Sequence, residues 1–489
     1  MMGTPFDLDR LRSTLRAVVP PGSRFGYQGL RATDAIAVEE LVPLEFLVAC
    51  DFGQDSREWD RQLRFFSLER GKSRRAIWTH SALVKGYGGP WGDRLRAYLL
   101  ESERPAYLIP YRSTEFLEEL AAASGGKLHI AANPVRLKSA LDDKASFRQA
   151  LPRLGLEPPP GLVALDHELS YPELRERLGP TFVAALPVGS AGSATFLVQS
   201  EDAWRAALEE AAQNQGPGGK LIVTRHLRGP SIGATALVFG EKVLLGNPSV
   251  QLSGVPHSAA HPFGYSGSDY SAYAQGVSRA VKEAVLDAAL RVGRWLGGLG
   301  YRGIFGVDFV AGEGRLWPLE VNPRLLGTTQ LMSELQSLAG GPPPSTFYHL
   351  AVLLGAGEPP EEAERENEVR AYQELHGFQL FLRNTSECPV RVTGEVPAGI
   401  YCLERGRPRY LRPGRRMREL REGEEFLLTC SVAERGKEIG PGAVFCKVQG
   451  FFPVVNTGLT GPSRQAVDLL EQLHQAFAPV PVEEAAGAH

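Results

Sequence analysis

The pattern of apolar and polar positions predicts alternating strands and helices in the first part of the chain. Residues 44–50 form an apolar run that is short enough for a buried strand. Residues 106–110 predict a second strand, and Ser113 or Thr114 is placed to cap the helix that follows it. A third strand is predicted at residues 128–130, after two glycines that end this helix. The order strand, helix, strand predicts an N-terminal α/β lobe.

The middle of the chain predicts a small mixed lobe, a long helix and a hairpin. Strand-like pieces at residues 182–186 and 221–224 are separated by a helical stretch at residues 203–212. Residues 277–299 place apolar side chains three and four positions apart, which is typical of an amphipathic helix. Two strands with a Gly-containing turn between them then span residues 303–321. These patterns predict an α+β unit whose hairpin carries acidic residues.

Prolines and one acidic stretch predict the domain boundaries. Residues 158–160 are three prolines, which cannot continue a regular helix, and residues 340–344 break the chain again. Residues 358–368 are acidic, contain proline and predict a solvated linker, and residues 378–455 predict short alternating strands between turns. We therefore expect an α/β and α+β multi-domain protein with an N-terminal α/β lobe at 1–138, a central domain at 139–355 and a small β-rich C-terminal domain at 370–489.

Composition and charge narrow the class of protein. A chain of 489 residues is too long for one hydrophobic core, and 43% hydrophobic with 22% charged residues is ordinary for soluble globular proteins. The 53 basic and 56 acidic residues give a formal charge of −3, without a long Lys/Arg run, so we expect no nucleic-acid partner. No apolar stretch approaches the roughly 18 to 20 residues of a membrane-spanning helix, and no leader pattern opens the chain. We expect a cytoplasmic protein with no membrane partner.

The five cysteines do not predict a disulfide framework or a zinc site, because they are odd in number, widely scattered and without a CxxC pair. Four of them, Cys388, Cys402, Cys430 and Cys446, fall where the sequence alternates between apolar and polar residues. We expect these four to be buried strand thiols.

The hairpin at residues 303–324 carries the clearest candidate chemistry. Glu320 and Asn322 are two positions apart and therefore share one face of their strand, and Asp308 lies on the partner strand. Three hard oxygen donors suit Mg²⁺, which usually keeps several waters and takes further ligands from nucleotide phosphates. The alternative is a solvent-facing acidic hairpin that binds no metal.

The strings GIFGVDF and LEVNPR, which end at Phe309 and Arg324, resemble the metal-binding hairpin of the ATP-grasp superfamily. The resemblance implies an ATP-grasp fold that binds ATP with Mg²⁺, or with Mn²⁺ as an alternative. It assigns Asp308, Glu320 and Asn322 as metal ligands and Arg324 as a catalytic residue that faces the phosphates or the acyl group.

Further matches follow in the order typical of the family. Asp143 and Lys144 open a helix as the family's nucleotide-contacting lysine does, and residues 189–193 (GSAGS) resemble its mobile glycine-rich phosphate loop. Residues 221–231 resemble the strand and turn whose backbone reads the adenine edge. The resemblance covers roughly residues 105–335. It implies a pre-ATP-grasp lobe before the ATP-grasp domain and a lid lobe at about 160–228 within that domain. The nucleotide-binding residues that it implies are Lys144, Gly189, Ser190, Gly192, Thr224, Arg225 and Leu227.

Two features depart from the family pattern. Residues 182–187 lack the lysine that usually precedes the glycine-rich loop, and Arg225 and Arg228 are the candidates to replace its charge. Thr224 and Ser231 stand where the family usually places acids that hold the ribose. These departures keep open a degenerate protein that binds nucleotide without turnover.

Two segments resemble family features near the acceptor pocket: a strand at residues 246–251 and a loop at residues 264–270. His257 and His261 lie between them and are candidates for bases toward an amine, the alternative being an ordinary loop role.

The implied reaction is an ATP-dependent carboxylate-amine (or thiol) ligation through an acyl phosphate, such as the ligation of amino acids or peptides. Small-molecule carboxylates and amines would be its partners, and superfamily analogy predicts a homodimer. Two alternatives remain: a nucleotide-binding sensor or scaffold without turnover, and a biotin-carboxylase-like carboxylating enzyme.

Overall fold

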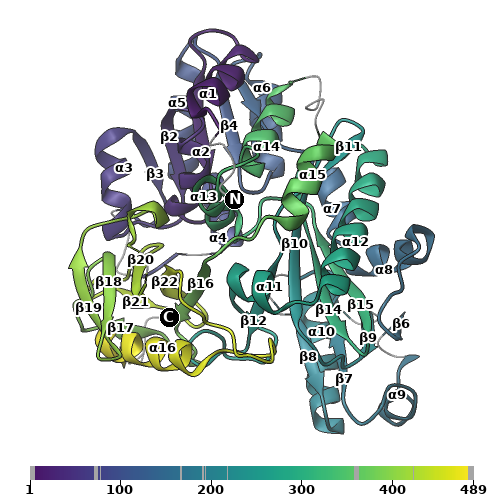
Figure 1. Cartoon of the computed structure of the whole chain (residues 1–489). Coiled ribbons are helices and arrows are strands. Elements are labelled where there is room, and N and C mark those ends of the chain that lie inside the picture. Colours follow the sequence, from purple (N-terminus) through teal and green to yellow (C-terminus); the bar gives the residue numbers. More distant parts are fainter. Residues whose placement is uncertain are drawn as a thin grey trace.

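The computed structural model describes most of the chain, namely residues 6–70, 75–77, 79–165, 168–189, 192, 194–216, 219–356, 363–421 and 423–482. Figure 1 shows the N-terminal lobe at the top, the C-terminal β-rich part at the lower left and a small lobe with β7, β8 and β9 at the lower right. Within the described residues, no helix combines the length and apolarity needed to cross a membrane.

The N-terminal lobe is built on a parallel sheet of five strands in the order β3-β2-β1-β4-β5. The predicted strands and helix are present, and Thr114 caps α6 by accepting a hydrogen bond from the backbone N–H of Leu117. The α/β prediction is confirmed. The elements are α1 Leu8–Ala17, β1 Arg24–Gln28, α2 Ile36–Glu39, β2 Leu44–Ala49, α3 Arg57–Gln62, β3 Arg64–Ser67, α4 His80–Tyr87, α5 Pro90–Glu101, β4 Ala106–Pro110, α6 Glu115–Ala123 and β5 Leu128–Ile130.

The small lobe is an antiparallel sheet of four strands in the order β6-β9-β7-β8. Its helices bury Leu174, Trp204 and Ala207 against strand residues such as Phe182 and Val223. Two helices, α7 Val135–Leu141 and α8 Lys144–Ala150, lead into it. Its elements are β6 Gly161–Leu165, α9 Tyr171–Leu178, β7 Phe182–Ala185, β8 Thr195–Val198, α10 Glu201–Gln215 and β9 Lys220–Arg225.

A sheet of eleven strands joins the central and C-terminal parts in the order β15-β14-β10-β12-β13-β16-β22-β20-β18-β19, with β11 paired to β10. The join is the antiparallel pair β13–β16, in which Gly267 lies opposite Leu380. The central elements are β10 Ser231–Phe239, β11 Lys242–Leu245, β12 Ser249–Ser253, β13 Tyr265–Asp269, α11 Tyr270–Gly276, α12 Arg279–Gly298, β14 Gly303–Gly312, β15 Arg315–Asn322, α13 Thr329–Ala339, α14 Ser345–Leu354 and α15 Ala363–Tyr372. The C-terminal elements are β16 Phe378–Arg383, β17 Val390–Val392, β18 Gly399–Glu404, β19 Arg407–Arg412, β20 Glu425–Thr429, β21 Glu438–Ile439, β22 Val444–Gly450, α16 Arg464–Phe477 and β23 Pro479–Pro481.

Three expectations about local structure are wrong. The predicted loop at 264–270 contains strand β13, because Gly267 has no Cβ and so lets the carbonyl of Gln379 approach; an added Cβ would lie 2.1 Å from that oxygen. Much of the expected linker is helix α15, which is fixed by Asn367 to the β11 backbone; its residues 358–362 lie outside the described part. Of the four cysteines expected to be buried strand thiols, Cys446 in β22 is one; Cys388 is exposed in the loop before β17, Cys402 in β18 is half-buried, and Cys430 is buried but follows the end of β20.

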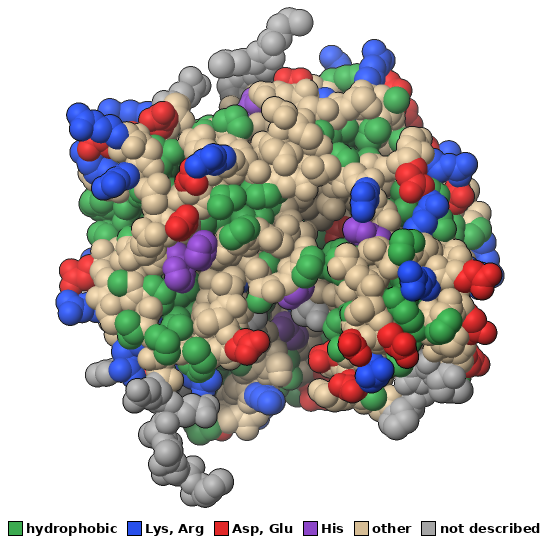
Figure 2. Space-filling model, turned by 90° about the horizontal axis from the view of Figure 1, so that it is seen from below, with side chains coloured by type: hydrophobic (Ala, Val, Ile, Leu, Met, Phe, Trp, Pro, Cys, Tyr) green, Lys and Arg blue, Asp and Glu red, His purple; other side chains and the backbone are tan. Residues whose placement is uncertain are grey.

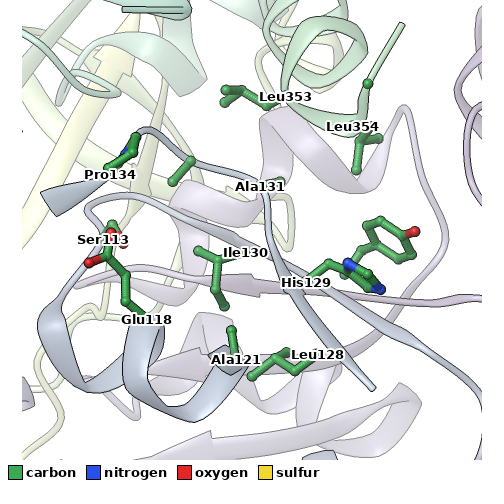
Figure 3. Close-up of a pocket in the computed structure, with 13 residues that line it drawn as sticks. Ser113, Glu118, Ala121, Leu128, His129, Ile130, Ala131, Pro134, Leu353 and Leu354 are labelled. Carbon is green, nitrogen blue, oxygen red and sulfur yellow. The ribbon is translucent and has the colours of Figure 1, made fainter. Parts of the chain in front are cut away.

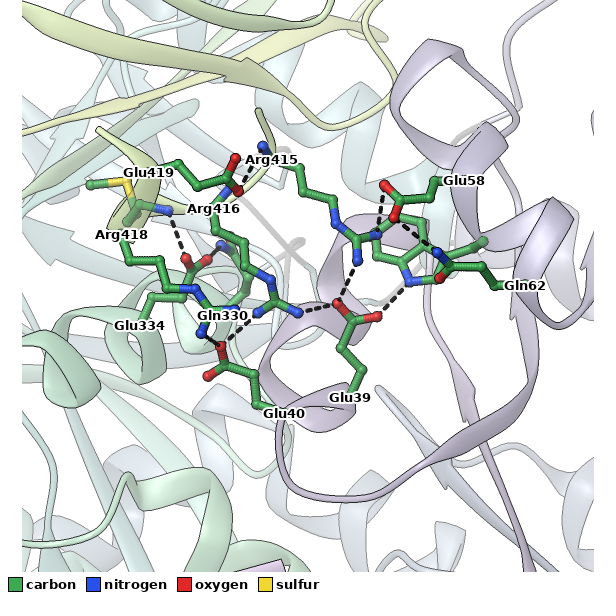
Figure 4. A network of polar contacts seen from close by, with 12 residues as sticks. Glu39, Glu40, Glu58, Gln62, Gln330, Glu334, Arg415, Arg416, Arg418 and Glu419 are labelled. Carbon is green, nitrogen blue, oxygen red and sulfur yellow. Dashed lines mark hydrogen bonds and ion pairs between the residues drawn. The ribbon is translucent and has the colours of Figure 1, made fainter. Parts of the chain in front are cut away.

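An ion-pair network connects the N-terminal lobe, α13 and the C-terminal part (Figure 4). The Arg416 guanidinium pairs with Glu39 and, at 2.8 Å, with Glu40, both from the N-terminal lobe. Beside it, the buried carboxyl of Glu334 on α13 accepts hydrogen bonds from the backbone N–H of Met417, at 2.7 Å, and from Gln330. Three parts of the chain that are far apart in sequence are thus held together by ion pairs and, at α13, by hydrogen bonds.

Glu334→Gln is expected to make stability less dependent on pH. Burial raises the pKa of Glu334 from 4.5 to about 7, so the folded state favours its protonated form. The stability that this proton provides is therefore present at low pH and lost, by up to roughly 3 kcal/mol, as the pH rises through about 7. Unfolding free energies of Glu334→Gln at pH 5 and pH 8 should differ less than those of the unmodified chain. The exposed Glu58→Gln is the control, and an unchanged difference in Glu334→Gln would contradict the account.

Candidate functional site

The antiparallel hairpin β14–β15 brings the three predicted metal ligands together. Asp308 lies directly opposite Glu320, and Asn322 lies opposite Gly306. The side-chain amide of Asn322 donates to Asp308 Oδ2 at 3.2 Å and to Glu320 Oε1 at 3.5 Å. The strand register is interrupted just after Asp308, and such bulges often re-aim side chains at functional sites.

Charged and polar groups from other elements surround this cluster. Lys144, the first residue of α8, places its Nζ atom 2.8 Å from Glu320 Oε2. Gln251 on β12 donates to Asp308 Oδ1 at 2.8 Å, and Arg324 donates to Asn322 Oδ1 at 2.9 Å. Arg324 also donates to the Tyr111 hydroxyl at 2.9 Å, so the N-terminal lobe helps to orient it.

The two carboxylates of the hairpin have opposite pKa shifts. Burial, with the neighbouring charge of Glu320, raises the pKa of Asp308 to about 8. Burial also acts to raise the pKa of Glu320, but the charge and hydrogen bond of Lys144, together with Asp308 and Arg324, outweigh it and the pKa is lowered. Two carboxylates held this close repel each other, and a cation between them would relieve that repulsion.

The hairpin fits a magnesium ion that shares its ligands with a nucleotide. Among the described residues, no cluster of three or more His, Cys, Asp or Glu side chains is arranged to hold a metal. Asp308, Glu320 and Asn322 instead supply two carboxylates and one amide, which suits Mg²⁺ because this ion keeps waters and binds phosphate oxygens. The same donor set would also accept Mn²⁺.

The hairpin opens into a cavity of about 810 Å³. Seven of the predicted site residues line it: Lys144, Gly192, Thr224, Asp308, Glu320, Asn322 and Arg324. Gly189, Arg225 and Leu227 are not among its lining residues, and Ser190 lies outside the described residues. The structure therefore brings the metal, phosphate and catalytic candidates together in one space.

The structure does not support the two arginines expected to replace the missing lysine. Arg225 pairs with Glu313 at the hairpin turn, and neither it nor Arg228 lines the cavity. Ala185 does line the cavity, at the place where the resemblance predicts a lysine. Arg148 on α8 also lines it and was missed from the sequence, because nothing in its local pattern distinguishes it from a surface arginine.

The two histidine candidates lie in different surroundings. His261 lines the cavity, and burial lowers its pKa, with the charge of Arg383 lowering it further. His257 packs against the His474 ring at 4.6 Å and is not a lining residue. Of the two, only His261 is positioned to meet a substrate in this cavity.

A second cavity, of about 500 Å³, lies in the N-terminal lobe (Figure 3). Apolar side chains such as Leu128, Ile130 and Leu353 form much of its wall. Its Glu118 carboxyl is occupied by the backbone N–H of Val135, at 2.7 Å. It contains none of the residues that the sequence predicted for chemistry.

Comparison with known proteins agrees with this geometry. Residues 141–328 match the family model of the ATP-grasp domain. The arginine-specific carbamoyl phosphate synthase large chain of Geobacillus stearothermophilus is 30% identical over 203 residues, which are 40% of this chain and 17% of that protein. The large chain from Clostridium perfringens is 25% identical over 265 residues, which are 52% of this chain and 23% of that one. This chain thus spans less than a quarter of either relative.

Solved structures show the same fold over most of the chain. The biotin carboxylase domain of 2-oxoglutarate carboxylase from Hydrogenobacter thermophilus, solved as a dimer with MgADP, ADP and bicarbonate, aligns with a TM-score of 0.56 at 16% identity. That alignment covers 89% of this chain and 87% of the other. Carboxyaminoimidazole ribonucleotide synthase from Aspergillus clavatus, in complex with ATP, aligns with a TM-score of 0.50 at 12% identity over 94% of this chain and 99% of the other. Residues 141–328 therefore match an ATP-grasp domain, and the fold of most of the chain is shared with these solved structures.

Proposed function

We propose that this chain is an ATP-dependent ligase that activates a carboxylate as an acyl phosphate and transfers the acyl group to an amine. The observation that carries the proposal is the meeting of Asp308, Glu320 and Asn322 with Lys144 and Arg324 in one cavity. Oxygen donors for a metal and cations for phosphates are what phosphoryl transfer to a carboxylate requires.

The residues have separate roles in this proposal. Asp308, Glu320 and Asn322 would hold Mg²⁺, which neutralises phosphate charge when it is bound. Lys144, which is held at Glu320, adds a positive charge beside the phosphates. Arg324 is held by Asn322 and Tyr111 and stabilises negative charge on the transferred phosphoryl group or the acyl oxygen. The reaction forms a bond from the substrate carboxylate to the γ-phosphorus with loss of ADP, and the amine then displaces phosphate.

The adenine would lie in the apolar part of the cavity. Val183 and Ile222 line it from the small lobe, and Thr224 and Ser231 lie near them in sequence and line it too. An apolar part of a cavity favours a purine ring through burial of its faces. Thr224 and Ser231 would present hydroxyls to the ribose where the family usually has acids. These hydroxyls can form hydrogen bonds with the ribose but carry no charge.

A carboxylating reaction is the second candidate. The fold match to a biotin carboxylase domain over most of the chain favours it, because the same phosphoryl transfer to bicarbonate would use the same metal and cations. A dimer is proposed on the same ground, since that solved structure is described as a dimer. On the face seen in Figure 2, basic and acidic side chains lie interspersed, a surface that suits small-molecule partners better than nucleic acid.

Lys144→Met is expected to weaken Mg-ATP binding by about tenfold or more, because a charge-assisted contact to phosphate is worth roughly 1.5 to 3 kcal/mol. Isothermal titration calorimetry with Mg-ATP measures this directly. Lys85→Met removes an exposed cation on α4, outside the cavity, and serves as the control. Binding of Mg-ATP that is equally tight in Lys144→Met and in the control would remove Lys144 from the nucleotide site, and no binding in the unmodified chain would contradict the proposed function.

A further inference from the structure

The same cavity has a second charged region, formed by Arg31, Asp34, Arg383 and Lys447, which we call the basic wall. Arg31 and Asp34 follow β1 in the N-terminal lobe, whereas Arg383 ends β16 and Lys447 lies in β22. None of the four lies within the residues 141–328 that match the ATP-grasp domain. The domain that binds nucleotide in this family therefore does not supply this wall.

Electrostatic effects show that the four groups lie close to one another. Burial raises the pKa of Asp34, and the charges of Lys447 and Arg31 pull it down. Burial, with the charge of Arg31, lowers the pKa of Arg383 to about 10. Tyr265 connects the wall to the hairpin, because the charges of both Arg383 and Asp308 act on its pKa. The wall thus contains three cations and one carboxyl in the cavity that also holds the candidate metal ligands.

Two of the cations are hydrogen-bonded to neutral groups rather than to carboxylates. Lys447 is 1% exposed and its Nζ donates to Gln330 Oε1 at 2.9 Å. Arg383 donates to the carbonyl oxygens of Ser258, at 2.9 Å, and Tyr265, at 2.7 Å. An amide or carbonyl oxygen satisfies the hydrogen bond but does not cancel the charge.

The guanidinium of Arg31 makes no hydrogen bond or ion pair with any residue in the described part of the chain, although it lines the cavity. Burial acts to lower the pKa of Arg31, whereas Cys430, Asp51 and Glu69 raise it. The two carboxyls among them are occupied elsewhere, and Asp34 is the one carboxyl of the wall itself. Glu69 pairs with Lys437, and burial raises the pKa of Asp51 to about 8, which favours its neutral form. The donors of Arg31 are therefore available to a ligand.

The segment that carries Arg31 is held rigidly against the C-terminal part. Asp51 accepts a hydrogen bond from the backbone N–H of Ala32, at 2.8 Å, and another from the Ser431 hydroxyl. Asp55 accepts from the Thr429 hydroxyl and from the backbone N–H of Ser431, both at 3.1 Å. A binding group that is fixed before its ligand arrives loses less entropy on binding.

We propose that the basic wall binds an anionic group, a carboxylate or a phosphate, on the substrate that is ligated, at a distance from the carboxylate that is activated. Three buried or partly buried cations that share one nearby carboxyl and make no ion pair among the described residues favour the arrival of an anion. A guanidinium pairs with either oxyanion through two parallel hydrogen bonds. This inference rests on the proposed function only for the identity of the ligand as a substrate; the binding of an anion at Arg31 does not depend on it.

The test is calorimetric titration of the full chain with inorganic phosphate and, separately, with malonate, both in the presence of saturating Mg²⁺ and AMPPNP. The nucleotide analogue occupies the phosphate positions next to the hairpin, so that added anions report on the wall. We expect binding that Arg31→Gln weakens by about tenfold or more, the loss of one charge-assisted pair. Arg31→Lys should retain part of the affinity, and Arg279→Gln, which removes an exposed arginine that pairs with Glu283 on α12, should retain all of it. A stronger response to phosphate or to malonate identifies the kind of anion.

The proposal would be overturned if the anions bound Arg31→Gln as tightly as they bind the unmodified chain. It would also be overturned if neither anion bound the unmodified chain at concentrations up to about ten times the millimolar range in which such anions usually bind. An intact AMPPNP titration shows that Arg31→Gln is folded. Absence of AMPPNP binding to the unmodified chain would contradict the proposed function instead. In that case, the same anion titration without nucleotide would still show whether Arg31 binds an anion.

Discussion

Glu320→Gln is expected to abolish most Mg-ATP turnover while leaving the fold intact. Glu320 is the carboxylate that faces Asp308 across the hairpin and is held charged by Lys144. The amide has nearly the same shape but no charge, so it would bind a metal weakly and leave Lys144 without its partner. A loss of roughly 100- to 1,000-fold in ADP release, or about 3 to 4 kcal/mol of transition-state stabilisation, is expected.

Glu283→Gln is the matched control for this change. Its carboxylate is 57% exposed on α12 and pairs with Arg279 four positions earlier, so the substitution removes one charge without touching the cavity. ADP release is measured for both variants over a range of Mg²⁺ concentrations. If high Mg²⁺ partly restores Glu320→Gln, the loss comes from metal binding, whereas full activity at all concentrations would remove Glu320 from the site.

Arg416→Met is expected to lower the free energy of unfolding by about 3 kcal/mol or more. Arg416 is 9% exposed and faces Glu39 and Glu40, which are 13% and 15% exposed. Removing the cation would take the most buried partner from two largely buried carboxylates and leave Glu39 with Arg415, at 3.4 Å, and Glu40 with the exposed Arg418. Loss of a buried partner typically costs about 3 to 5 kcal/mol. Because these contacts join the N-terminal lobe to the C-terminal part, we also expect the two parts to separate at a lower denaturant concentration. Equilibrium denaturation followed by tryptophan fluorescence measures the change.

Arg418→Met provides a close comparison, since Arg418 also pairs with Glu40, at 2.7 Å, but is 58% exposed. An exposed pair contributes about 0 to 1 kcal/mol, so this variant should unfold almost as the unmodified chain does. Equal losses for Arg416→Met and Arg418→Met would show that burial of the pair does not determine its contribution. The double variant Arg416→Met with Glu39→Gln should be less destabilised than Arg416→Met alone, because one uncompensated charge is gone.

Local pattern predicted the elements of this fold where one strong signal decided the structure. The hairpin 303–321, the helix now seen as α12 and the strands of the N-terminal lobe all follow from apolar periodicity and glycine turns. β13 was missed because Tyr265–Asp269 is mostly polar, and its strand conformation depends on pairing with β12 and β16. The local sequence alone does not determine such tertiary pairing. The same holds for α15, whose position depends on Asn367 and the β11 backbone.

The residues of the candidate site also fall into those that the local sequence predicts and those that depend on tertiary structure. Asp308, Glu320 and Asn322 lie on one hairpin, so strand alternation alone brings them together. Arg31, Arg383 and Lys447 come from three elements that meet only when the N-terminal lobe and the C-terminal strands close over the cavity. Gln251 and Tyr111 were missed for the same reason, since each contacts the hairpin from a distant strand or loop. The sequence predicted the candidate residues that lie close together in the chain. It did not predict those that only the tertiary fold brings together.

The most direct test of the central claim is ADP release from Mg-ATP, measured against a panel of amino acids and small carboxylates, each with and without an amine acceptor. The account predicts that one carboxylate and one amine together stimulate ADP release, that the new product contains a C–N bond, and that Glu320→Gln removes the stimulation. ATP binding without stimulated release by any pair, with bicarbonate included in the panel, would contradict the ligase and favour a protein that binds nucleotide without turnover.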